Sequence, residues 1–132
     1  DRVVVDAPCT GAGTWRRHPE AKWKLTPEAI DQRREDQASA LRVASEYVRP
    51  GGFLVYITCS ILPAENEEQV AAFAEANLEF ELVSLGQVWQ DLFGFDKRQP
   101  WSSDLNSVTL TPASTGTDGF FVSVFARDAA DT

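Results

Sequence analysis

Two short apolar segments that each lead to a thiol constrain the fold of this chain more than any other feature. The β-branched run at 2–5 leads within a few residues to Cys9, and the apolar run at 53–58 leads directly to Cys59. A helical pattern lies between the two runs, and this alternation is typical of strands in a largely parallel sheet joined by a crossover helix. Because ligands bind at the carboxyl ends of such strands, we expect the two thiols to meet at one edge of the sheet.

The remaining elements agree with an α/β fold that has helices on both sides of the sheet. Thr26 is suited to cap a helix, and Pro27 to occupy its first position. The last strand is apolar almost throughout and is expected to be buried on both faces. Residues 84–107 give no clear assignment. Strands are predicted at 2–5, 53–58, 80–83 and 119–125, helices at 27–47 and 63–76, a long loop at 7–25, a short apolar piece at 108–110 and a frayed tail at 128–132.

Length and composition narrow the class of protein. A chain of 132 residues suits one domain. It contains no apolar run near the roughly 20 residues that cross a bilayer, so no membrane partner is expected. Two widely separated cysteines make a poor disulfide framework and indicate a reducing, cytoplasmic setting.

The charge distribution favours a local contact with nucleic acid rather than a broad one. A net charge of −8 argues against an extended basic surface. Residues 14–24, however, interleave Trp15 and Trp23 with cations, and such a segment can contact RNA phosphates and stack on bases. The alternative is a solvated loop whose aromatic rings pack into the fold. The candidate substrate-binding residues here are Arg16, Arg17, His18, Lys22 and Lys24.

Four interpretations compete for Cys9 and Cys59. Free thiols commonly pack at strand ends without any chemical role. A metal could bind both thiols and His18, although the chain has no CxxC or HxxxH pair. A cysteine hydrolase would need His18, the only histidine, as its base. The fourth interpretation combines both thiols with Asp6 in covalent catalysis followed by elimination.

Methylation at C5 of a pyrimidine needs chemistry of this fourth kind, because C5 is a poor nucleophile. A thiolate that adds to C6 turns C5 into an enamine carbon able to attack an activated methyl group. A group near N3 must stabilise the charged ring, a base must then remove the C5 proton, and the thiolate must leave. One acid and two thiols at neighbouring strand ends can supply these functions.

Three segments resemble motifs of the RNA 5-methylcytosine methyltransferases, the Fmu/Sun group of bacterial rRNA enzymes. Residues 6–13 with 16–19 resemble motif IV, residues 58–67 resemble motif VI, and residues 117–121 resemble the closing motif of the family. The resemblance covers essentially the whole chain. Two long motifs in the right order and at the right separation are far more specific than one short pattern.

The resemblance implies transfer of a methyl group from S-adenosylmethionine to C5 of a cytidine in RNA, through a covalent adduct at C6. It implies that Cys59 is the nucleophile, that Cys9 assists product release, and that Asp6 lies at the cofactor and target base with Pro8. DNA cytosine methyltransferases use the motif IV thiol as nucleophile, so the presence of both thiols points to RNA. The alternative is an RNA-binding module that keeps the motifs without turnover.

The resemblance also implies a Rossmann-like fold of which residues 1–127 form the carboxyl-terminal half, with strands four to seven in the order 4-5-7-6. The family's glycine-rich cofactor loop does not appear in the sequence. We therefore expect most of the S-adenosylmethionine site to lie upstream, and residues 1–132 alone to be inactive and to bind no detectable cofactor. The strand at 2–5 would present an open edge, which predicts self-association.

Overall fold

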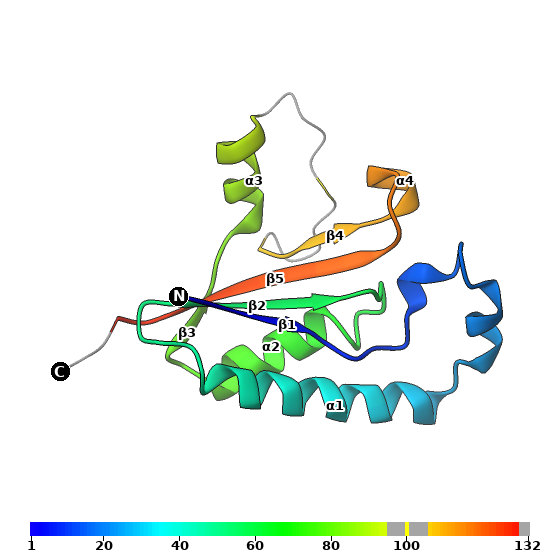
Figure 1. The fold of residues 1–132 in the computed structure, drawn as a ribbon, viewed down its shortest axis with the longest axis horizontal. Helices are drawn as coiled ribbons and strands as arrows, with labels where there is room; N and C mark the ends of the chain where they lie inside the picture. The colour runs from blue at the N-terminus through cyan, green and yellow to red at the C-terminus, as the bar shows by residue number, and fades with distance from the viewer. Residues whose placement is uncertain (95–99, 101–105, 130–132) are drawn as a thin grey trace.

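A computed structural model of the chain describes residues 1–94, 100 and 106–129 (Figure 1). Within these residues, none of the helices has the length and apolar character that crossing a membrane requires. The strands are β1 Arg2–Asp6, β2 Phe53–Thr58, β3 Phe80–Leu82, β4 Val108–Leu110 and β5 Phe120–Arg127. The helices are α1 Pro27–Ser45, α2 Glu67–Ala76, α3 Leu85–Phe93 and α4 Pro112–Thr115, with two 3-10 helices, η1 Ala12–Thr14 and η2 Pro19–Lys24, between β1 and α1.

The sheet has the strand order β1-β2-β5-β3, and β4 also pairs with β5. With β1, β2, β3 and β5 counted as strands four, five, six and seven of the family fold, this order is the predicted 4-5-7-6. β4 lies outside this count. β3 and β4 share one edge of β5, since β4 pairs with residues 120–122 and β3 with residues 125–127. Among the described pairs, β1 has only β2 as a neighbour, so its other edge is open as predicted.

The sheet was predicted to be largely parallel, and this prediction is wrong, because only one of the four described strand pairs is parallel. β1 and β2 pair in parallel, but β5 runs antiparallel to β2, β3 and β4. A parallel neighbour requires a long crossover, whereas β4 and β5 are joined only through the short helix α4. The chain therefore turns back on itself, and β5 begins at the edge where β1 and β2 end.

Helices cover both faces of the sheet, as predicted. α1 and α2 pack together under one face, and α3 lies by β4 on the other (Figure 1). The core under the first face is aromatic: the Phe73 ring centroid lies 5.3 Å from that of Phe80 and 4.9 Å from that of Phe125. Along β5, Phe121 and Phe125 are fully buried, but the alternate residues are only partly covered. Full burial of β5 on both faces was therefore a wrong expectation, because α3 covers only part of the second face.

The start of α2 and the segment 7–25 differ from the prediction, whereas the start of α1 agrees with it. α1 begins where predicted, and the Thr26 side chain accepts a hydrogen bond from Ala29 N–H. α2 begins at Glu67 rather than at residue 63, because residues 63–66 form turns whose side chains are used elsewhere. The predicted loop at 7–25 contains η1 and η2, which keep this long segment close to the sheet edge. The unassigned segment 84–107 contains α3, and its residues 95–99 and 101–105 lie outside the described residues.

Candidate active site

The two thiols meet at the edge where the parallel strands end. β1 ends at Asp6 and β2 ends at Thr58, and the register pairs Asp6 with Ile57. The loops that leave these strands bring Cys9 Sγ to 3.1 Å from Cys59 Sγ. Both thiols are free and half-buried. The juxtaposition expected from the two strand ends is therefore present.

The contact between the sulfur atoms makes the two thiols unequal. The hydrogen bond from Cys9 lowers the pKa of Cys59 to about 7, against the opposing effect of burial and the charges of Asp6 and Glu65. The same hydrogen bond, together with burial, raises the pKa of Cys9. The lowered pKa of Cys59 and the raised pKa of Cys9 favour Cys59 as the acceptor of this hydrogen bond and Cys9 as its donor. A thiolate is the nucleophilic form of cysteine, so Cys59 is the more reactive of the pair near neutral pH.

A fully buried carboxylate lies behind the thiols. Glu65 has no exposed surface, and its two oxygens accept four hydrogen bonds. Thr10 donates twice, through its backbone N–H (2.9 Å) and its hydroxyl (2.6 Å). Gln37 Nε2 (2.8 Å) and Ser60 Oγ (2.6 Å) complete the set. The sequence alone places Glu65 only at a helix start, where an acid is common. The structure instead makes it the link between the two thiol-bearing loops.

A second buried side chain stabilises the loop that carries Cys59. Asn66 Oδ1 accepts a hydrogen bond from Thr58 Oγ1 (2.6 Å), and Asn66 Nδ2 donates to the Ser60 carbonyl (2.8 Å). Tyr56 is a buried residue of β2 whose hydroxyl donates to the Glu65 carbonyl (2.6 Å). Burial raises the pKa of Tyr56. These contacts explain why residues 65 and 66 are unavailable to begin α2.

Three loops cross at two glycines beside the thiols. Gly13 N–H donates to the Cys59 carbonyl (2.8 Å), and Gly119 N–H donates to the Gly13 carbonyl (2.6 Å). A Cβ atom at Gly13 would lie 2.2 Å from the Gly119 carbonyl oxygen. A Cβ atom at Gly119 would lie 2.6 Å from Gly13 Cα. Only glycine permits this close approach of backbone to backbone.

Two of the predicted substrate-binding cations are held by one aspartate at the site. Asp118 Oδ1 accepts from Arg16 Nε (3.0 Å), and Asp118 Oδ2 accepts from Arg17 Nε (2.5 Å). Burial opposes ionisation of this carboxyl group, but the two arginines outweigh it and lower the pKa of Asp118. Both guanidinium groups remain about half exposed. Asp118 therefore orders this part of the cationic segment against the start of β5.

The other predicted substrate-binding residues lie along η2. Lys22 Nζ lies 5.9 Å from the Trp15 ring centroid and 5.8 Å from that of Trp23. Lys24 lines a cavity of about 220 Å³ beside the first thiol. His18 Nδ1 lies 3.7 Å from Glu20 Oε1. Among the described residues, no hydrogen bond joins the His18 imidazole to either thiol, and the two thiols contact each other instead. The cavity is lined by Cys9, Thr10, Ala21, Lys24, Leu25, Ala29 and Arg33.

The predicted cofactor contacts, Asp6 and Pro8, are both exposed at the end of β1. Among the described residues, no side-chain hydrogen bond occupies the Asp6 carboxylate, although its charge acts on Cys59. The part of the chain that the structure describes also holds no group of three or more His, Cys, Asp or Glu side chains placed to bind a metal.

Comparison with known proteins agrees with this geometry. Residues 1–126 match the family model of 16S rRNA methyltransferase RsmB/F. The chain is 37% identical over 121 residues to Ribosomal RNA small subunit methyltransferase B of Serratia proteamaculans, covering 92% of the chain and 25% of that protein. It thus spans about a quarter of the length of this curated relative.

Solved structures share the fold over nearly the whole chain. The crystal structure of PH0851 superposes with a TM-score of 0.81 at 34% identity, covering 95% of this chain and 26% of that one. The structure of NSun6 from Pyrococcus horikoshii with SFG gives a TM-score of 0.72 at 25% identity, covering 97% and 30%. The fold is therefore that of a Rossmann-like methyltransferase. The chain belongs to the RsmB/F family of 16S rRNA methyltransferases.

Proposed function

We propose that the protein containing this chain transfers a methyl group from S-adenosylmethionine to C5 of a cytidine in RNA, and that the RNA is ribosomal. The observation that carries this proposal is the pair of unequal thiols 3.1 Å apart at the strand ends. The family assignment supports the reaction class, and the name of the relative, a small-subunit rRNA methyltransferase, supports the substrate.

The residues of this chain divide the reaction between them. The Cys59 thiolate forms a bond to C6 of the cytidine, and the displaced ring electrons make C5 nucleophilic. S-adenosylmethionine supplies the electrophilic methyl group when bound. Loss of the C5 proton to a base then allows the Cys59–C6 bond to break, which regenerates the thiolate. Cys9 assists this release, because its thiol lies beside the departing sulfur and can donate a hydrogen bond to it.

Asp6 and Pro8 fit a contact with the cofactor and the target base. An exposed carboxylate at the carboxyl end of a parallel strand can accept hydrogen bonds from a ligand bound there. The relative whose structure holds SFG, an analogue of S-adenosylmethionine, supports a cofactor of this class. Residues 1–127 supply the thiols in this proposal and only part of the cofactor site.

The cationic segment is the proposed RNA contact. Arg16 and Arg17 are fixed by Asp118 yet keep exposed guanidinium groups. Lys24 lies by the cavity next to Cys9. Positive groups around a catalytic thiol are suited to hold the phosphates on either side of a cytidine. His18 and Lys22 extend the same contact along η2.

The open edge of β1 and the free thiols add two further proposals. Val4 is 60% exposed on this strand, and unpaired apolar edges pair with other chains. Residues 1–132 produced alone are therefore expected to self-associate through β1. The two free thiols require reducing conditions, which favours a cytoplasmic location.

Methyl transfer to deproteinised 16S rRNA tests the proposal. The full-length protein with S-adenosylmethionine should convert cytidine to 5-methylcytidine, measured by nucleoside mass spectrometry. Cys59→Ser should abolish the product while leaving RNA affinity unchanged. Binding of rRNA without formation of 5-methylcytidine, in the unaltered protein as in the variant, would identify an RNA-binding module instead.

A further inference from the structure

Glu65 is a fully buried carboxylate at the site, and the reaction above gives it no part. It has no exposed surface, and α1, the loop after β1 and the loop after β2 all contribute donors to it. A buried carboxylate is costly unless hydrogen bonds satisfy it. Here Oε1 accepts from two hydroxyl groups, and Oε2 accepts from a backbone N–H and a side-chain amide. The four donors thus satisfy both oxygens of the buried carboxyl group.

The donors are adjacent in sequence to the reactive thiols. Thr10 follows Cys9 directly, and Ser60 follows Cys59 directly. Gln37 extends the same network to α1, because its Nε2 group also donates to the Pro8 carbonyl (2.9 Å). The carboxylate thus joins the residue after each thiol and, through Gln37, the residue before Cys9. The Sγ–Sγ distance depends on how these two loops are held.

We propose that Glu65 is a positioning residue that sets the Cys9–Cys59 juxtaposition and thereby keeps Cys59 reactive. The proposal rests on the proposed function for its purpose. Its physical content, the geometry of the thiol pair, can be measured without RNA or cofactor. Glu65 acts on the two sulfur atoms through Thr10 and Ser60, the residues that it holds.

The direction in which the pKa of Cys59 moves separates positioning from a direct charge effect. As a nearby negative charge, Glu65 raises the pKa of Cys59, so a purely electrostatic role predicts that Glu65→Gln lowers it. Positioning predicts the opposite. The nitrogen of a glutamine amide replaces one of the two acceptor oxygens, so two of the four donors to residue 65 lose their acceptor. This loosens the loops and weakens the Cys9 hydrogen bond that lowers the pKa of Cys59. The remaining groups that act on Cys59, Asp6 and its own backbone, are unchanged.

The experiment measures the alkylation rate of Cys59 by iodoacetamide against pH in the full-length protein, with the labelled site identified by peptide mass spectrometry. In Glu65→Gln we expect the midpoint to move up from about 7 toward the ordinary thiol value. The thiolate fraction at pH 7 should fall by roughly tenfold as a result. In a Cys9→Ala background the same substitution should leave the midpoint where Cys9→Ala alone puts it or below, because the group being positioned is missing.

Matched variants keep the proposal testable if Glu65→Gln folds poorly. Thr10→Val removes one hydroxyl donor to Glu65 and should shift the midpoint in the same direction, whereas Thr10→Ser retains the hydroxyl and should restore it. Glu68→Gln alters an exposed glutamate of α2 that pairs with Arg34, and should leave the midpoint unchanged.

Two outcomes would overturn the proposal. A downward shift in Glu65→Gln would show that its charge, not its hydrogen bonds, acts on Cys59. An unchanged midpoint with only a lower melting temperature would reduce Glu65 to a part of the folded core. Neither result contradicts the methyltransferase proposal. Conversely, an upward shift of the Cys59 midpoint would support the positioning role of Glu65 even if the protein transferred no methyl group.

Discussion

Cys9 and Cys59 lie 50 positions apart in the sequence, and their sulfur atoms lie 3.1 Å apart in the structure. At this distance one thiol stabilises the other as a thiolate, so the two cysteines cannot have identical roles. Cys59 has the lower pKa and is suited to attack, and Cys9 has the raised pKa and is suited to donate. This contact supports the roles that the proposed function gives to the two thiols.

The first prediction concerns pH. Because the pKa of Cys59 is lowered to about 7, its thiolate forms as the pH rises through 7, and its alkylation rate should rise over the same range. Cys9→Ala removes the hydrogen-bond donor that causes the shift, so the midpoint should move toward about 9, with a loss of tenfold or more in thiolate fraction at pH 7. A pH profile identical in the two proteins would show that Cys9 does not activate Cys59.

The second prediction concerns oxidation. A hydroperoxide should convert the Cys59 thiolate to a sulfenic acid, and the Cys9 thiol should then displace water from it to give a disulfide. The sulfur atoms need to approach by only about 1 Å to reach bonding distance. Intact-mass analysis should show a loss of two hydrogens that dithiothreitol reverses. Cys9→Ala should instead accumulate sulfinic acid. If Cys59 of Cys9→Ala were still oxidised only to a product that dithiothreitol reverses, the proposed pairing of Cys59 with Cys9 would be contradicted.

The third prediction concerns the crossing of loops at Gly13 and Gly119. Gly13→Ala places a methyl group 2.2 Å from a backbone oxygen that cannot move aside as a side chain would. We expect the free energy of unfolding to fall by an amount at the upper end of the about 1–3 kcal/mol that overpacking costs, and we expect activity to be lost. Urea unfolding measures the change in the free energy of unfolding. Gly51→Asn is the matched control, because nothing lies within 4 Å of its added Cβ and asparagine tolerates the positive φ there. Equal stability in both variants would refute the close approach.

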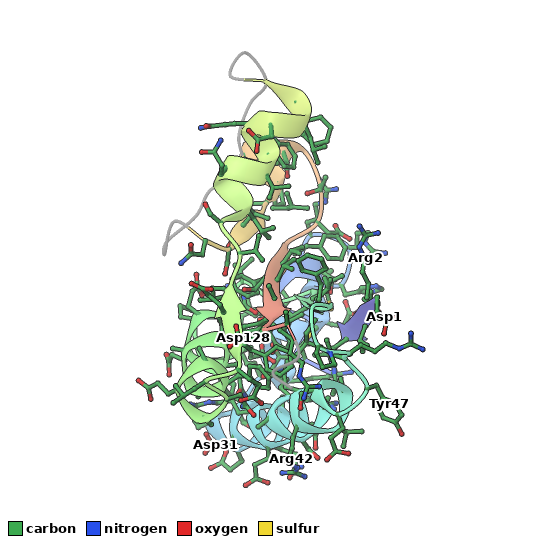
Figure 2. The ribbon with its side chains drawn as sticks, turned by 90° about the vertical axis from the view of Figure 1, so that its left-hand side faces the viewer. Asp1, Arg2, Asp31, Arg42, Tyr47 and Asp128 are labelled. Carbon is green, nitrogen blue, oxygen red and sulfur yellow. The ribbon has the colours of Figure 1, made fainter. Side chains whose placement is uncertain are left out.

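The fourth prediction concerns RNA binding. If Lys24 contacts a phosphate, Lys24→Gln should weaken binding and reduce the slope of log K against log salt by about 0.7 for single-stranded RNA. Arg42→Gln is the control, because Arg42 lies on the last turn of α1, and α1 ends on the side of the molecule where the N-terminus lies (Figure 1). Figure 2 shows Arg42 on the outer side of this helix. Fluorescence anisotropy of labelled RNA over a salt series measures the slope for each of the two variants. A slope that falls equally in both variants would argue against a specific contact at Lys24.

The elements that carry the thiols were predictable because local sequence determines them. A β-branched run, a Thr26–Pro27 helix start and an apolar strand fixed β1, α1 and β2 to within two residues. The meeting of Cys9 and Cys59 then followed from parallel strands, which end at one edge. The helix α3 was missed, although Ser84 caps its start and Gly94 ends it with a φ of 82°. Those two signals could have located it.

The rest of the site depends on contacts that local sequence does not encode. An apolar run such as β5 does not reveal its direction, which the short connection through α4 determines. Glu65 follows Pro63 where a helix start normally has an acid, so its burial and its four donors could not be inferred. Asp118 lies in the segment 117–121, which the sequence marks only by its resemblance to a family motif, and its two arginine partners lie about a hundred residues away.

Trapping the covalent adduct tests the division of roles between the thiols most directly. The full-length protein, S-adenosylmethionine and 16S rRNA transcribed with 5-fluorocytidine should form an RNA–protein complex that survives denaturation, because fluorine at C5 blocks the elimination. Peptide mapping should place the bond on Cys59, and Cys59→Ser should abolish it. On unmodified rRNA, at a pH near 9 where a large fraction of Cys59 is ionised in either protein, Cys9→Ala should accumulate an adduct on Cys59. A bond to Cys9, or no adduct in any of these reactions, would contradict the account.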